Sequence, residues 1–197
     1  MSEHIIINIL DLLDNLGESD TKNVLSEFSC PLNPEIENFL QNNALEFAKS
    51  KKSITYLVFD DEEQERFVGY FTLTHKSSLV PADFLTNASR RKIERYAELD
   101  DTTNSYDVSA FLLAQFGKNY SVENGKSISG DSLMDDVFCI LKEVQHLIGG
   151  GVVFLECEEN NPKLLNFYQS KINRFKQYGE RISKKDKKKY LQLLRFF

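Results

Sequence analysis

Residues 124–168 constrain the fold most, because a loop rich in Gly and Ser leads there into an amphipathic helix and then into an apolar strand. Apolar residues recur every three or four positions over 133–148, which is the spacing of one buried helix face. The three glycines at 149–151 predict the end of that helix. The run at 152–155 is apolar and rich in β-branched residues, so we expect a strand covered on both faces.

The loop at 125–130 has the residue types of an anion site. Gly and Ser are small enough for the main chain to wrap a phosphate, and the N–H groups of a first helical turn have no partners within the helix. A Gly/Ser turn before a helix is also common in α/β proteins without a ligand, so the loop alone leaves both interpretations open. A P-loop nucleotidase and a Rossmann dehydrogenase are disfavoured, because the Walker spacing and the GxGxxG motif are both missing.

Composition indicates an ordinary globular protein. The chain has 197 residues, of which 41% are hydrophobic and 27% charged, so we expect one domain over 1–197 with one core. No apolar stretch approaches the roughly 20 residues that span a bilayer, and the N-terminus lacks the basic start of a signal peptide. We therefore expect a cytoplasmic protein with no membrane contact. Three cysteines without CxxC spacing predict buried free thiols, and three widely separated histidines predict no metal site.

Charge is distributed unevenly. Residues 171–197 hold 10 Lys or Arg and 2 Asp or Glu, a net +8, so the first 170 residues carry −14 of the total of −6. A basic tail on an acidic body can attract nucleic acid or the phosphates of a cofactor. The lysine run at 184–189 also fits a solvated hairpin turn, and the acidic body argues against RNA binding.

The order of predicted elements indicates a mixed α/β fold, that is, one sheet with helices on its faces. Spacing and end signals predict helices over 5–15, 34–52, 90–96, 133–148 and 162–171. Runs of β-branched and aromatic residues predict strands over 54–60, 66–74, 108–116, 152–155, 173–179 and 189–196, with an acidic hairpin tip at 61–65.

Three stretches, in their order along the chain, resemble the GNAT N-acetyltransferase family, and more narrowly its branch that includes toxins of bacterial toxin–antitoxin pairs. They are FSCPLNPEIENFLQNNALEFA at 28–48, VGYFTL at 68–73, and Asn161-x-x-Leu164-x-x-Phe167-Tyr168. Together they cover residues 28–178. The resemblance implies a mixed, largely antiparallel twisted sheet flanked by helices on both faces.

The same resemblance implies that acetyl-CoA is the co-substrate and that a primary amine attacks its thioester directly. Tyr168 would be the catalytic acid, since a phenol with a pKa of about 10 is protonated at neutral pH. The alternative is a tyrosine that only packs beside Phe167. The residues implied to contact acetyl-CoA are Phe116, Gly117, Lys118, Gly125, Lys126, Ser127, Ile128, Ser129, Gly130, Asp131, Asn161 and Phe167.

Two departures from the family pattern keep a second function open. Gly125 and Ile128 stand where the family's loop has Arg or Gln and a glycine, so a GNAT-shaped binding protein without catalysis is the alternative.

No general base is evident, although Glu156, Glu158 and Asp107 are candidates. The acceptor amine would belong to an aminoacyl-tRNA, a peptide or a small molecule, and the further partners that the resemblance implies are an antitoxin and a second copy of the chain.

Overall fold

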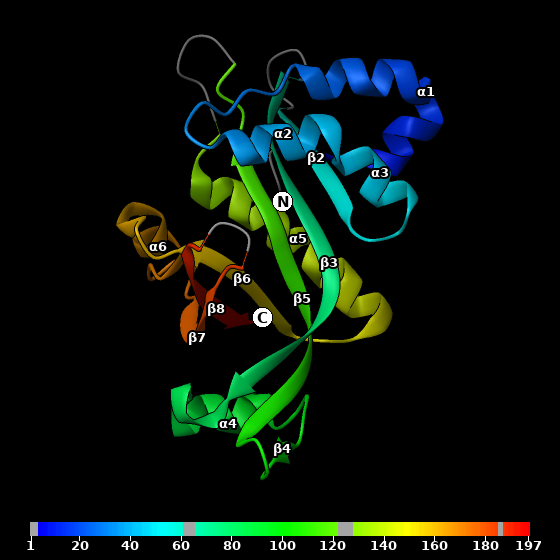
Figure 1. The fold of residues 1–197 in the computed structure, drawn as a ribbon. Helices are drawn as coiled ribbons and strands as arrows, with labels where there is room; N and C mark the ends of the chain where they lie inside the picture. Colours follow the sequence, from blue (N-terminus) through cyan, green and yellow to red (C-terminus); the bar gives the residue numbers. More distant parts are fainter. Residues whose placement is uncertain (1–3, 61–65, 122–127, 185–186) are drawn as a thin grey trace. The chain divides into compact units, whose positions relative to one another are not determined.

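A computed structural model of the chain describes residues 4–60, 66–121, 128–184 and 187–197 (Figure 1). The Cα positions divide into two compact units: unit 1 is Met1–Thr74 with Leu113–Leu141, and unit 2 is His75–Leu112 with Lys142–Phe197. The expectation of a single domain over 1–197 stays a prediction.

The elements follow one another along the colour gradient of Figure 1. Unit 1 contains β1 (His4–Asn8), α1 (Ile9–Ser26), α2 (Pro34–Asn42), α3 (Ala44–Lys49), β2 (Ile54–Asp60) and parts of β3 (Arg66–Pro81), β5 (Ser105–Lys118) and α5 (Gly130–Ile148). Unit 2 contains the remainder of those three, with the 3-10 helix η1 (Ala82–Phe84), α4 (Asn87–Ile93), β4 (Leu99–Asp100), β6 (Val152–Glu158), α6 (Pro162–Tyr168), β7 (Lys176–Ile182) and β8 (Lys189–Phe196).

The strands of the described residues pair in the order β1-β2-β3-β5-β6-β8-β7, with β4 added beside β5. The pairs β1–β2, β2–β3, β4–β5, β6–β8 and β7–β8 are antiparallel. By contrast, β5 and β6 are parallel, with Phe111 opposite Val153 and Leu112 opposite Phe154. The prediction of a mixed, largely antiparallel sheet with helices is therefore confirmed.

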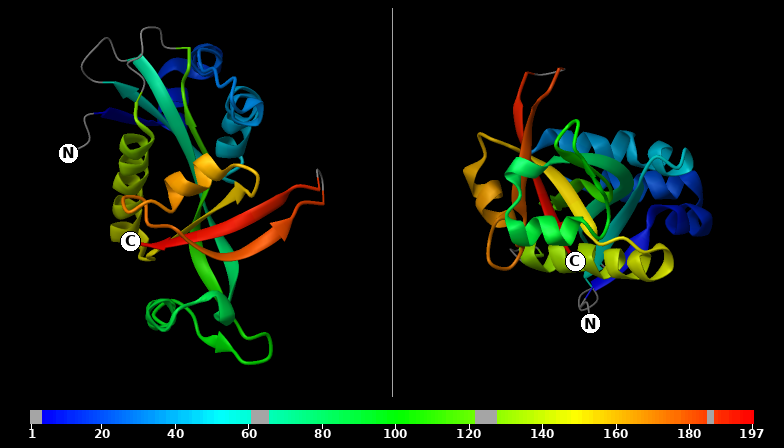
Figure 2. Two further views of the ribbon diagram at one scale, coloured as in Figure 1. Left: turned by 90° about the vertical axis from the view of Figure 1, so that its left-hand side faces the viewer. Right: turned by 90° about the horizontal axis from the view of Figure 1, so that it is seen from below.

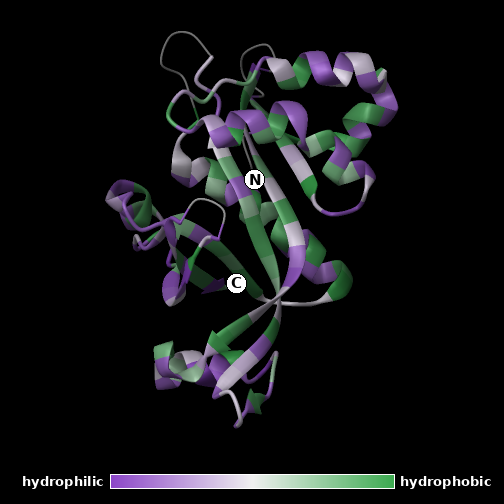
Figure 3. Cartoon of the chain, in the orientation of Figure 1, coloured by the Kyte–Doolittle hydropathy of each residue, from purple (hydrophilic) through white to green (hydrophobic). Residues whose placement is uncertain are grey.

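Helices cover both faces of the sheet in unit 1. A side chain at Gly69 of β3 would meet the methyl groups of Leu133 of α5 at 3.3 Å. The next residue, Tyr70, points the other way, and its hydroxyl donates to the carbonyl oxygen of Ile36 in α2 at 2.7 Å. Figure 3 shows α1 and α2 with alternating hydrophilic and hydrophobic stretches, as expected for helices with one face on a core.

Each unit has its own hydrophobic core. In unit 1 the core joins α1, α2 and α3 to β2 and β3, with Ile9, Leu25, Leu40, Leu57 and Tyr70 all buried. In unit 2 the core joins β3, α4 and β5 to β6, β7 and β8; its fully buried members include Val80, Ile93, Tyr106, Val108 and Tyr178. No helix in the described residues is long and apolar enough to cross a membrane.

The prediction of a helix over 5–15 is wrong at its start. His4–Asn8 is a strand, with Ile5 opposite Phe59 and Ile7 opposite Leu57 of β2. Three consecutive β-branched residues fit a pleated strand as well as a helix face, and the partner strand decides. The helix begins instead at Ile9, after the Asn8 cap, and continues to Ser26 through a non-helical Gly17 with φ 79°.

Other boundaries move by a few residues. A break at Asn43 divides the predicted helix over 34–52 into α2 and α3, although Asn33 caps its start and Pro34 opens it as expected. The helix predicted over 90–96 begins at Asn87, because Thr86 caps it. The helix over 162–171 ends at Tyr168, and the strand over 173–179 begins at Lys176. The acidic tip at 61–65 lies outside the described residues.

Helix α5 and strand β6 occur where the spacing predicts them. Leu133, Val137 and Leu141 of α5 are buried. The same spacing placed either Leu147 or Ile148 on the buried face, but these residues are 77% and 70% exposed. The helix ends before Gly149 and Gly150, which adopt φ values of 79° and 93°. Residues 152–155 are all buried, which confirms a strand covered on both faces.

Candidate functional site

Phe116, Gly117 and Lys118 form the end of β5 in unit 1. A Cβ atom at Gly117 would stand 2.6 Å from Cγ2 of Ile36 and 3.2 Å from Cζ of Phe28. These contacts explain a glycine at this position by the packing of α2 and the segment before it. A role of the three residues in acetyl-CoA binding stays a prediction.

Asn119, directly after β5, ties three segments of unit 1 together, and sequence reasoning missed it. Its side chain is buried, and its Nδ2 donates to the carbonyl oxygen of Phe67 at 2.9 Å and to that of Glu27 at 3.3 Å. Its Oδ1 accepts from the N–H groups of Ser29 at 2.9 Å and Ser121 at 3.1 Å. Asn119 therefore fixes where β5 ends, immediately before the loop that the sequence marks as an anion site.

The predicted anion site opens α5 in unit 1, and Gly125, Lys126 and Ser127 lie outside the described residues. Ile128 is buried, so its side chain is turned away from solvent. Ser129 caps the helix: its Oγ accepts from the N–H of Ser132 at 2.9 Å, and its carbonyl oxygen accepts from that of Leu133 at 3.0 Å. The N–H groups of Ser132 and Leu133 are therefore already used within the helix. A phosphate bound at this helix start would have to interact with main-chain N–H groups that come before Ser132. Gly130 and Asp131 are the first two residues of the helix.

Asn161, Phe167 and Tyr168 lie on or next to α6 in unit 2. Asn161 caps the helix, since its Oδ1 accepts from the N–H of Leu164 at 3.1 Å, and Pro162 takes the first helical position. This local signal explains why the short helix forms at the point that the sequence indicates.

Tyr168 is buried, with 6% of its surface exposed. Its ring packs edge-on against Phe167 and Phe175, with ring centres 5.2 Å and 5.8 Å away. Burial first, and then the neighbouring Cys157, raise the pKa of the Tyr168 phenol well above its ordinary value of 10.0. The phenol is therefore protonated at neutral pH, as a proton donor must be, and the same packing serves the structural alternative.

The three carboxylates considered as general bases all have partners in unit 2. Glu156 accepts from Nε of Arg181 at 2.9 Å and from Nε2 of Gln192 at 3.1 Å. Glu158 pairs with Lys188 at 2.7 Å, and Asp107 accepts from the hydroxyl of Ser77. Burial raises the pKa of Glu156, but the bonds from Arg181 and Gln192, with the charges of Arg181 and Lys76, lower it below 4.5 overall. A carboxylate with a lowered pKa is a weak base.

We therefore expect Glu156→Gln to leave any acetyl transfer within a few-fold of the wild type and to change stability instead. The pKa of Glu156 is lower in the folded chain than in the unfolded chain, where it is about 4.5, so the ionised carboxylate stabilises the folded state. This stability is fully present above pH 4.5 and is lost as the pH falls through the folded-state pKa. Urea unfolding near pH 7 and below about pH 4 measures this: wild type should exceed the variant near neutrality, and the difference should shrink in acid. A constant difference at both pH values would contradict the lowered pKa.

Two lysines of the basic run, Lys188 and Lys189, are paired with carboxylates. β7 and β8 form a hairpin (Figure 2). Lys188 pairs with Glu158, while Lys189 pairs with Glu159 at 2.9 Å and Glu180 at 3.0 Å. Residues 185–186 lie outside the described part of the chain.

Cys30, Cys139 and Cys157 are free thiols, of which Cys30 and Cys157 are buried. Burial, and then the charge of Glu158, raise the pKa of Cys157 to about 11, so this thiol is inert at neutral pH. Within the described ranges no group of three or more His, Cys, Asp or Glu side chains could hold a metal ion.

Comparison with known proteins gives the fold a name. No protein-family model matches the chain, and no curated protein sequence matches it.

Solved structures do match over almost the whole chain. The AtaTR complex bound with acetyl-CoA has a TM-score of 0.58 at 15% identity and covers 100% of this chain and 94% of its own. AtaT complexed with acetyl-methionyl-tRNAfMet has a TM-score of 0.59 at 15% identity, covering 95% and 93%. A tyrosine-to-phenylalanine mutant of KacT has a TM-score of 0.60 at 15% identity, covering 95% and 94%.

The chain has the GNAT fold. The structures that it resembles, AtaT and KacT, are GNAT-fold toxin acetyltransferases. The predicted site residues fall into two groups, each within one unit of this GNAT fold. The end of β5 and the start of α5 belong to unit 1, and α6 with Tyr168 belongs to unit 2.

Proposed function

We propose that this chain is an N-acetyltransferase that transfers the acetyl group of acetyl-CoA to a primary amine. The observation that carries the proposal is the GNAT fold over the whole chain, matched by a structure with bound acetyl-CoA. Tyr168 in α6 supports it, because its phenol is protonated at neutral pH and so carries a proton, although the raised pKa makes it a weaker acid than a free tyrosine. The buried Ile128 also supports it, since its side chain is turned inward and does not cover the main chain at residue 128.

In the proposed reaction the amine nitrogen attacks the thioester carbon, the C–S bond breaks, and no covalent enzyme intermediate forms. The N–H groups of Phe116 and Lys118 would donate to the carbonyl oxygen as negative charge develops on it. Tyr168 would donate its phenol proton to the departing sulfur, and the proton that the amine loses restores the phenol through solvent. The products are an N-acetylated amine and CoA with a free thiol.

For the acceptor, we propose the α-amine of an aminoacyl-tRNA as the first class to test. AtaT, which has the same fold, occurs in complex with acetyl-methionyl-tRNAfMet. Solved complexes also contain the antitoxin AtaR, so we propose a small protein partner of that kind for this chain. The ion pairs of the basic hairpin oppose the tRNA acceptor, and a peptide or small amine is the alternative.

Calorimetry with acetyl-CoA tests the co-substrate. We expect saturable binding with a dissociation constant below about 1 mM, and release of a free thiol when an acceptor amine is added. Acetate is the control titrant, because it carries the acetyl group without the thioester, the pantetheine arm or the phosphates. The absence of heat and of any thermal shift with millimolar acetyl-CoA would contradict the enzyme and favour the binding protein without catalysis.

A further inference from the structure

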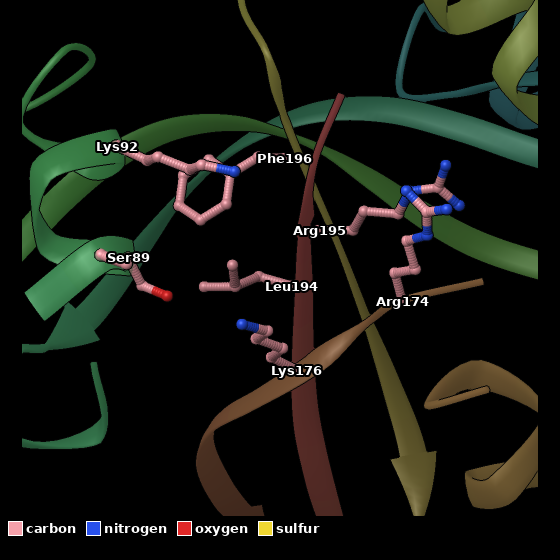
Figure 4. Close-up of a pocket in the computed structure, with 8 residues that line it drawn as sticks. Ser89, Lys92, Arg174, Lys176, Leu194, Arg195 and Phe196 are labelled. Atoms are coloured by element: carbon pink, nitrogen blue, oxygen red, sulfur yellow. The ribbon is translucent and has the colours of Figure 1, made fainter. Parts of the chain in front are cut away.

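A basic cavity of about 290 Å³ lies within unit 2, between α4, the segment before β7 and the end of β8 (Figure 4). This volume is near the lower end for small-molecule sites, so the cavity suits a compact ligand. Its lining combines cationic, small and apolar side chains: Ala88, Ser89, Lys92, Arg174, Lys176, Leu194, Arg195 and Phe196.

Three cations of this cavity, Lys92, Arg174 and Lys176, differ from Lys188 and Lys189 of the hairpin in having no carboxylate partner within the described residues. Four of its eight lining residues are Lys or Arg, and none is acidic. Across the described ranges, no carboxylate lies within 4.0 Å of the charged groups of Lys92, Arg174 or Lys176. Lys92 instead holds its Nζ 5.7 Å from the centre of the Phe196 ring. Cations gathered without carboxylates are stabilised by an anion that binds among them.

Ser89 adds an oriented donor that is independent of charge. It is 6% exposed, and its Oγ accepts from the hydroxyl of Thr86 at 3.1 Å. Its own hydroxyl proton has no acceptor in the described part of the chain. Figure 4 shows this hydroxyl directed into the cavity, on the same side of β8 as Lys92 and Lys176. A buried hydroxyl that faces a cavity with a proton to donate is suited to an acceptor atom of a ligand.

Arg174 and Arg195 stand on the other side of β8 (Figure 4), and main-chain carbonyls hold each guanidinium. Nε of Arg174 donates to Lys171 at 3.0 Å, and Nη1 of Arg195 donates to Asn173 at 2.9 Å. Arg174 itself adopts φ 56°, a left-handed conformation that is uncommon for a residue other than glycine. A second, smaller cavity shares Lys92 and Phe196 with the first and is also lined by Arg95.

We propose that this cavity binds the phosphate group of a compact phosphate ester. Ser89, Lys92 and Lys176 would donate to the phosphate oxygens, and Leu194 and Phe196 provide an apolar floor for the organic part. Phosphate is favoured over a carboxylate because it carries −1.5 to −2 charges and three acceptor oxygens, which match several cations and a hydroxyl. The ester would be a free mononucleotide or sugar phosphate, or a phosphate within an RNA strand. This site does not depend on acetyl transfer.

The site is tested by titrating the full chain with four ligands in turn: inorganic phosphate, adenosine 5′-monophosphate, a short single-stranded RNA and acetate. The pocket variant is Lys92→Gln/Lys176→Gln, and Lys142→Gln/Lys163→Gln is the control with the same change of net charge at exposed positions outside the cavity. We expect phosphate and the mononucleotide to bind at least about tenfold more weakly to the pocket variant, and equally to wild type and control. Ser89→Ala should weaken binding several-fold with no change of charge.

The remaining outcomes are decisive. Binding of the RNA strand but not of the mononucleotide, with the same loss in the pocket variant, would support the phosphate site and assign its ligand to a nucleic acid. Equal affinities of the pocket and control variants would overturn the proposal, because the attraction would then be unspecific. Acetate binding as tightly as phosphate would overturn the phosphate chemistry. Acetyl-CoA binding, measured separately, distinguishes failure here from failure of the proposed enzyme.

Discussion

Tyr168→Phe is expected to lower the turnover of acetyl transfer by about 10² or more while leaving the affinity for acetyl-CoA nearly unchanged. The phenol is buried and its pKa is raised, so at neutral pH it carries the proton that the departing thiolate needs. Phenylalanine keeps the ring packed against Phe167 and Phe175 and removes only the hydroxyl. Steady-state release of CoA thiol and calorimetry of acetyl-CoA measure the two quantities.

Tyr106→Phe is the matched control, because Tyr106 is also buried in unit 2 and its hydroxyl donates to Glu94 at 3.3 Å. Its turnover should stay near that of wild type. If both variants keep wild-type turnover, Tyr168 has a packing role only. If both lose it to the same extent, the effect comes from the core of unit 2 and not from a proton donor.

Local signals in the sequence are sufficient to predict much of the fold. The period of α5, the run of β6 and the Asn33-Pro34 start of α2 depend on residues close together in the chain. The strand His4–Asn8 does not, because its conformation is decided by pairing with β2, some 50 residues later. The exposure of Leu147 and Ile148 at the end of α5 is likewise not a local property. Whether a residue on the apolar face of a helix is buried depends on whether another element of the fold packs against it.

For the candidate site too, the local features could be predicted from the sequence and the surroundings of the residues could not. The spacing from Asn161 to Tyr168 predicts a capped helix that ends in a tyrosine, and α6 has that form. What surrounds the tyrosine could not be predicted, since the chain must turn back through residues 169–174 before Phe175 reaches its ring. The basic cavity could not be predicted from the sequence, because Lys92 of α4 and Lys176 of β7 line it together only in the folded unit 2.

Asn119→Ala is expected to lower the free energy of unfolding by about 2–4 kcal/mol, the scale for leaving buried backbone groups without partners. The side chain accepts from Ser29, 90 residues away, and donates to Phe67, 52 residues away, so alanine strands both an N–H and a carbonyl. Urea unfolding, with the midpoint and slope fitted together, measures the change. Asn119→Asp provides a second variant, since it keeps the acceptor for Ser29 and loses the donor to Phe67.

The control for Asn119 is Asn42→Ala on the exposed surface of α2, where the side chain bonds to Asn38 at 2.9 Å and to no other described residue. That change should stay within about 0.5 kcal/mol of wild type, because water replaces the lost bond. Asn119→Asp should fall between alanine and wild type near neutral pH. If Asn119→Ala costs no more than Asn42→Ala, the three segments are held together by the apolar packing of Phe28, Phe67 and Tyr70 alone, and the end of β5 does not depend on its asparagine.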